Sequence, residues 1–103
     1  MIDEADYEAF VWIRDNVSKD YSTAILDPWK ATAFTAVTGK QVYTRIHFSP
    51  RPPDEEAYAF LRNGCVDTGF LQRNGISLVY TRGPCSNPDL VAVRENVYLL
   101  RTE

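Results

Sequence analysis

Histidine, cysteine and glycine are scarce in this chain of 103 residues, and the scarcity limits the chemistry available to it. The single histidine is His47, and the two cysteines, Cys65 and Cys85, lack the spacing of a zinc site. The glycines at 64, 69 and 75 fit neither a phosphate-binding loop nor a dinucleotide fingerprint. We therefore expect no metal ion and no cofactor.

Long apolar runs and an excess of positive charge are also missing. The formal charge is −3 and the pI about 5.1, which leaves no basic footprint for nucleic acid. The longest apolar runs, such as residues 76–80, fall far short of the roughly 20 residues that cross a bilayer. With 45% hydrophobic and 24% charged residues, the composition is that of one globular domain over residues 1–103.

The hydrophobic pattern alternates between helix and strand periods. Phe10, Ile13 and Val17 mark a helix over 4–18, and the run 76–81 is apolar on nearly both faces, as in a central strand. Glu95-Asn96 suits a hairpin turn. The pattern predicts an α/β fold: a mostly parallel small sheet flanked by helices, ending in an antiparallel β-hairpin. Further helices are expected at 28–38, 54–63 and 66–73, and strands at 23–26, 41–44, 90–94 and 97–101.

The junction at residues 27–30 is the strongest local candidate for a ligand site. In open α/β sheets, ligands bind beyond the carboxyl ends of strands. Asp27 could hold a sugar hydroxyl or a metal there, Trp29 could stack on a sugar face, and Lys30 follows directly. The structural alternative is that Asp27 caps the next helix, Pro28 is its first residue and Trp29 packs.

Other polar residues have structural explanations beside their functional ones. His47 and the acids at 54–56 could belong to a small enzyme, but a loop histidine and acids at a helix start account for them. Asn16 opens an Asn-Val-Ser acceptor pattern for N-glycosylation, a triplet that also arises by chance. Cys65 and Cys85 are either two reduced thiols or a disulfide that closes a loop of about 20 residues.

Several segments together resemble a known family. An acidic helix containing Trp12-Ile13-Arg14 precedes a strand that ends in Asp27-Pro28, and the chain closes with a strand around Tyr98. The pattern is similar to the C-terminal soluble region of prokaryotic polytopic membrane glycosyltransferases and related proteins. The segments that carry it are 8–16, 24–28, 36–43, 71–80 and 94–101.

The resemblance implies a domain on the extracytoplasmic face of the membrane, cut from a longer chain whose membrane portion holds the catalytic acid. No catalytic residue is carried over to this sequence. The implied partners are that membrane portion and a glycan or lipid-linked sugar. An outward-facing domain also favours the Cys65–Cys85 disulfide and a glycan on Asn16.

Two functions follow as expectations. The first is a non-catalytic extracytoplasmic accessory domain of a membrane glycosyltransferase-like protein, which would contact an acceptor or a partner and support the membrane active site. The alternative is a free-standing small-molecule or nucleotide-binding α/β module, with its site near Asp27, Trp29 and Lys30.

Overall fold

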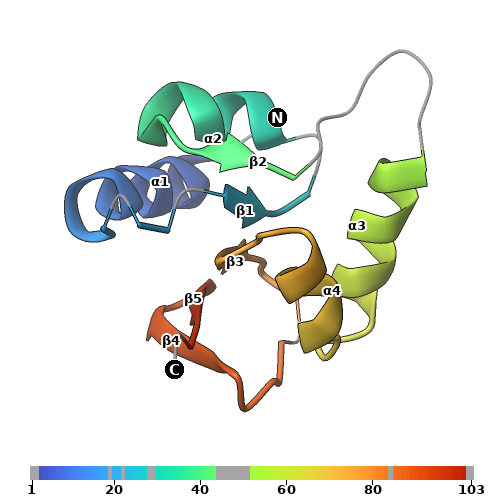
Figure 1. The fold of residues 1–103 in the computed structure, drawn as a ribbon. Helices are drawn as coiled ribbons and strands as arrows, with labels where there is room; N and C mark the ends of the chain where they lie inside the picture. Colours follow the sequence, from blue (N-terminus) through green and yellow to red (C-terminus); the bar gives the residue numbers. More distant parts are fainter. Residues whose placement is uncertain are drawn as a thin grey trace.

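The computed structural model describes residues 3–18, 20–21, 23–27, 30–43, 52–83 and 85–101, with only the backbone of residues 52–55. Helices and strands follow one another in the order α-β-α-β-α-α-β-β-β within these residues (Figure 1). They are α1 (Glu4–Asn16), β1 (Thr23–Ile25), α2 (Ala31–Thr38), β2 (Gln41–Val42), α3 (Pro52–Arg62), α4 (Thr68–Arg73), β3 (Leu78–Tyr80), β4 (Leu90–Arg94) and β5 (Val97–Leu100).

The strands form one mixed sheet in the order β2-β1-β3-β5-β4. β1 pairs in parallel with β2 and with β3, whereas β5 pairs antiparallel with β3 and with β4. The expected mostly parallel sheet is therefore wrong, although the mixed α/β class and the terminal hairpin are present. β3 lies in the middle of the sheet and all three of its residues are buried, as its apolar sequence predicted.

The hairpin is the reason why the sheet is mixed. Asn96 has φ 69°, in the left-handed region that a tight turn between β4 and β5 requires. The turn brings β5 rather than β4 beside β3, because Thr81 N–H donates to the Asn96 carbonyl and Leu100 N–H to that of Ser77. The return segment 81–89 carries the chain back so that β4 runs in the same direction as β3, and the two-residue turn then places β5 between them, antiparallel to both.

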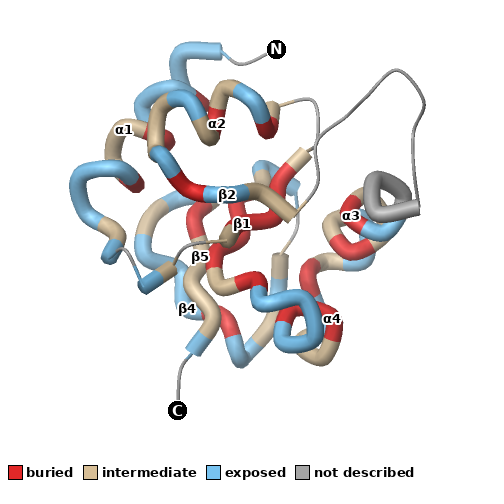
Figure 2. The backbone as a smooth tube through the Cα atoms, turned by 45° about the horizontal axis from the view of Figure 1, so that its top comes forward, coloured by how far each residue is buried: buried red, intermediate tan, exposed pale blue. Residues whose placement is uncertain are grey.

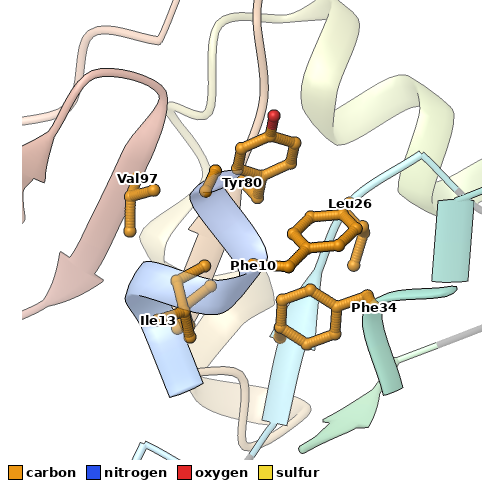
Figure 3. Packing of buried hydrophobic residues seen from close by; sticks show 9 residues of the cluster. Phe10, Ile13, Leu26, Phe34, Tyr80 and Val97 are labelled. Carbon is orange, nitrogen blue, oxygen red and sulfur yellow. The ribbon is translucent and has the colours of Figure 1, made fainter. Parts of the chain in front are cut away.

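α1 and α2 cover one face of the sheet. The Phe10 ring of α1 meets Phe34 of α2 and Tyr80 of β3 edge to face, with ring centroids 5.1 and 5.2 Å apart. Figure 3 shows these rings together, with the Tyr80 hydroxyl pointing out of the cluster. Ile13 and Val97 complete the contact between α1 and the sheet and are fully buried.

α3 and α4 cover the opposite face. The alternate strand residues Ile25 and Val79 point to this side, where Phe60 and Phe70 stack with ring centroids 5.4 Å apart. Figure 2 shows the buried stretches gathered where the helices meet the sheet. The domain thus has three layers, as strands that alternate with helices predict. None of the described helices is long and apolar enough to span a bilayer.

Local signals explain most helix ends. Asp3 and Asp6 form a capping box at the start of α1, each side chain accepting from the other's backbone N–H at 2.9 and 3.1 Å. The sequence suggests helix stops at the glycines 64, 69 and 75. Gly64 and Gly75, both with positive φ, follow α3 and α4 in Schellman turns and stop these helices, whereas Gly69 lies inside α4. α3 begins at Pro52, two residues before the predicted start at Asp54.

The start of α2 differs from the prediction. Lys30 is the N-cap residue of the described helix and its side chain makes no capping hydrogen bond, so the assignment of Asp27 as the N-cap residue is wrong. The Asp27 carbonyl accepts from Lys30 N–H at 2.8 Å and closes a turn ahead of the helix. The predicted first helical residue, Pro28, lies outside the described residues. Asp27 also lines the pocket described below.

The chain returns from β3 to β4 without a helix, and this return is fixed to the α3–α4 connection. Cys85 forms a disulfide with Cys65. Ser86 N–H donates to the Gly64 carbonyl at 2.9 Å, and the Asn87 side chain donates to that of Cys65 at 2.7 Å. The disulfide therefore holds a segment that has few apolar contacts of its own.

Opening the disulfide should lower stability markedly. Closing a loop of 20 residues contributes roughly 3 kcal/mol in the chain-entropy model, so a reductant should lower the free energy of unfolding by about that amount. Urea denaturation with and without reductant measures the change. The Cys65→Ala/Cys85→Ala variant is the control, because a reductant should not affect it. Equal stability of the reduced and oxidised wild type would contradict the expectation.

Candidate functional site

A pocket of about 490 Å³ opens at the carboxyl ends of β1 and β3. These neighbouring strands connect in opposite directions, since the chain passes from β1 through α2 to β2 on one side and returns through α3 and α4 to β3 on the other. Such a switch point leaves a crevice in which α/β proteins bind ligands. The volume lies within the roughly 300–1,000 Å³ typical of small-molecule sites.

Two walls of different character enclose the pocket. The first consists of Lys30 and the end of β3 with the residues after it, from Tyr80 to Gly83. The second consists of the carboxyl-terminal half of α3, which contributes Tyr58, Leu61 and Arg62. Asp27 lies beside both, with its Oδ1 3.5 Å from the Tyr58 hydroxyl.

A buried carboxylate, that of Asp6, lies behind the first wall. Its side chain is only 1% exposed. It accepts from the Tyr80 hydroxyl at 2.6 Å and forms an ion pair with Lys30 Nζ at 3.0 Å. Arg82 Nε lies 3.5 Å from it, and Arg82 also pairs with Asp3 at 2.7 Å. The pocket-lining residues of this wall are therefore held in place from behind.

These contacts set the protonation of the cluster. Burial by itself raises the pKa of Asp6, but hydrogen bonds from Tyr80, the Asp3 backbone and Lys30 bring it below its ordinary 3.8. Backbone and Arg82 hydrogen bonds lower the pKa of Asp3 to about 2. Burial and the hydrogen bond to Asp6 raise the pKa of Tyr80 to about 12. At neutral pH, Asp6 is ionised and Tyr80 is the donor between them.

The structure brings together two of the three residues that the sequence nominated at this junction. Asp27 and Lys30 both line the pocket, whereas Trp29 lies outside the described residues. His47 also lies outside them, as do the side chains of Asp54 and Glu55. Within the described part of the chain, no three potential ligands gather as a metal site would need.

The remaining nominated residues lie away from the pocket. Asn16 is exposed at the end of α1, where its side-chain amide donates to the Trp12 carbonyl at 3.0 Å, and its glycosylation stays a prediction. Of the two alternatives for the cysteines, the structure has the disulfide between Cys65 and Cys85.

Sequence reasoning missed most of the pocket. Arg82 and Gly83 directly follow a strand, so the rule that selected Asp27 would also have selected them. Tyr58 and Arg62 are four residues apart and share one helix face, but no sequence signal showed which way that face would point. From the sequence, Asp6 is an acid suited to a helix start, and a buried carboxylate looks the same in sequence as an exposed one.

Comparison with known proteins adds no relative to this description. No family model, no curated protein and no solved structure matches the chain. The site must be interpreted from its own residues.

Ionised Asp6 should contribute an acid-sensitive part of the stability. The pKa of Asp6 is depressed on folding, so its contribution is present above about pH 4 and is lost as the pH falls through the folded-state value. Asp6→Asn should lower the free energy of unfolding by about 3–5 kcal/mol at pH 7, because Lys30 loses its buried partner. Below pH 4, the free energy of unfolding of Asp6→Asn should also fall less steeply with pH than that of the wild type.

Urea denaturation between pH 7 and pH 2 measures both effects, with Asp20→Asn, in an exposed turn, as the control. If Asp6→Asn does not fold, the carbon chemical shift of the Asp6 carboxyl in the wild type gives the same information. A midpoint of titration above 3.8 would contradict the described cluster.

Proposed function

We propose that this chain is a non-catalytic extracytoplasmic accessory domain of a membrane glycosyltransferase-like protein, and that it contacts a sugar through the pocket at the ends of β1 and β3. The observation that carries the proposal is the position of Asp27 and Lys30, which meet Tyr58, Arg62 and Arg82 around one cavity at the switch point. Hydroxyl, carboxylate and cationic groups that converge in this way suit a polar small ligand.

The disulfide supports the proposed location. Structural disulfides persist in oxidising environments and are rare in the cytosol of most organisms. Cys65 is fully buried, and the bond ties the end of α3 to the segment before β4, so it belongs to the packing of the domain. A domain facing outward from the membrane would meet the conditions under which such a bond forms.

The arrangement of the resembling segments also supports the proposal. They supply the end of β1 with Asp27 and the end of β3 with Tyr80, and both residues line the pocket. The helix with Trp12 is α1 and the last segment holds β5, and neither of them contributes a lining residue.

The position of the pocket also favours the second candidate, a free-standing small-molecule or nucleotide-binding module. Switch-point crevices serve many soluble α/β proteins, and fold alone does not assign function. The two candidates differ in what surrounds the domain. Only the first requires membrane-spanning segments in the same polypeptide.

The gene that encodes this chain provides the first test. If the same reading frame encodes no membrane-spanning segments, the accessory-domain proposal is wrong and the free-standing module replaces it. If it encodes them, membranes with the full-length parent should transfer sugar from a lipid-linked donor.

In that parent, the Asp27→Asn/Tyr58→Phe variant should raise the KM for the bound sugar substrate roughly tenfold with little change in kcat. The variant loses the Tyr58 hydroxyl and one charged acceptor oxygen of Asp27; a hydrogen bond contributes about 0.5–1.5 kcal/mol, and 1.4 kcal/mol is tenfold in affinity. Tyr7→Phe, on the exposed side of α1, is the control. A loss of kcat at unchanged KM would mean that the pocket takes part in the chemistry, which contradicts a non-catalytic role.

A further inference from the structure

The cations that line the pocket are not equivalent. Lys30 pairs with buried Asp6, and Arg82 pairs with Asp3 and lies within 3.5 Å of Asp6. Both cations are thus already paired with carboxylates of α1 and its N-cap. Arg62 is different: it is exposed in the last turn of α3, and among the described residues no ion pair or hydrogen bond reaches its guanidinium. Arg62 is thus the group in the lining that can accept an anion without breaking an existing pair.

Arg62 is placed at a defined interval from the acidic part of the pocket. Tyr58 and Arg62 stand four residues apart on α3, so they project from the same helix face about 6 Å apart along its axis. The Tyr58 hydroxyl is itself 3.5 Å from the Asp27 carboxylate. The pocket therefore presents a guanidinium about one helical turn from a hydroxyl and a carboxylate.

This combination restricts the ligand. A guanidinium binds the oxygens of a carboxylate or phosphate through two parallel N–H···O hydrogen bonds. Asp27 and Tyr58 suit the hydroxyl groups of a sugar, because an ionised carboxylate accepts hydrogen bonds from them. The same carboxylate repels further negative charge, so a polyphosphate that fills the whole pocket would be disfavoured.

We infer that the pocket binds a saccharide that carries a single anionic group, a sugar phosphate or a sugar acid, with the anion on Arg62 and ring hydroxyls on Asp27 and Tyr58. This inference rests on the proposed sugar contact and gives it a ligand class. It disfavours a nucleotide triphosphate as the ligand, since the further negative charge of the triphosphate would meet Asp27.

Isothermal titration of this 103-residue chain tests the inference directly. Glucose 1-phosphate and glucuronic acid represent the two sources of the anion, and glucose, inorganic phosphate and ATP are the comparison ligands. The two sugar anions, or one of them, should bind at least about tenfold more tightly than each comparison ligand, because charged hydrogen bonds contribute roughly that factor. Binding should weaken as ionic strength rises.

Two substitutions identify the anchor points. Arg62→Gln should weaken binding of the sugar anion about tenfold or more. The matched control is Arg73→Gln, which removes an exposed arginine from the corresponding last turn of α4, outside the pocket. Asp27→Asn should lower the ratio of sugar-phosphate to inorganic-phosphate affinity, because it replaces one charged acceptor oxygen with an NH2 donor and removes the repulsion of the anion.

Several results would overturn the inference. They are no binding of either sugar anion at millimolar concentration, equal affinity for inorganic phosphate or ATP, an unchanged affinity in Arg62→Gln, and an unchanged ratio in Asp27→Asn. Because binding is measured on this chain alone, failure here with a confirmed membrane parent would reject the ligand class and leave the accessory role. Binding here without a membrane parent would reject the accessory role and keep the ligand class.

Discussion

The carboxylate of Asp6 is the constraint on which much of this fold depends. An ionised acid without a partner inside a protein costs several kcal/mol, so its burial is tolerable only when donors surround it. Asp6 obtains them from the Asp3 backbone, from Tyr80 at the end of β3 and from Lys30 just before α2. Three parts of the chain that are remote in sequence must therefore meet at one point, which fixes the first turn of α1 near the carboxyl ends of β1 and β3.

Because of this constraint, the polar groups of the two pocket walls have different roles. The Asp6 side uses its charged and hydroxyl groups to hold the domain together, with Tyr80 and Lys30 engaged from behind. On the α3 side, Arg62 lines the pocket from the last turn of the helix, and no ion pair among the described residues holds it. The wall on the Asp6 side can thus stay rigid while the α3 wall contacts a ligand. Ligand binding then does not have to break the contacts that stabilise the fold.

The sequence predicts this fold better than it predicts the site, for a physical reason. The spacing of apolar residues and the residue types at turns are local signals. The order of helices and strands and the helix stops at Gly64 and Gly75 could therefore be predicted from the sequence. Which strands lie beside β3 depends on pairing between residues far apart in sequence, and local signals do not show it. The expectation of a mostly parallel sheet was wrong for this reason. Asp27 and Lys30 follow β1 directly and were found, whereas Arg62 reaches the same pocket from a helix whose orientation depends on tertiary packing.

The orientation of α3 connects the disulfide to the pocket. Cys65 lies three residues beyond Arg62 and is bonded to Cys85 in the return segment between β3 and β4. That segment begins with Arg82 and Gly83, which line the opposite wall. The disulfide therefore links the two walls covalently: it joins the chain just after α3 to the segment that follows β3. An oxidising compartment of the kind that we propose for the domain would keep the two walls joined.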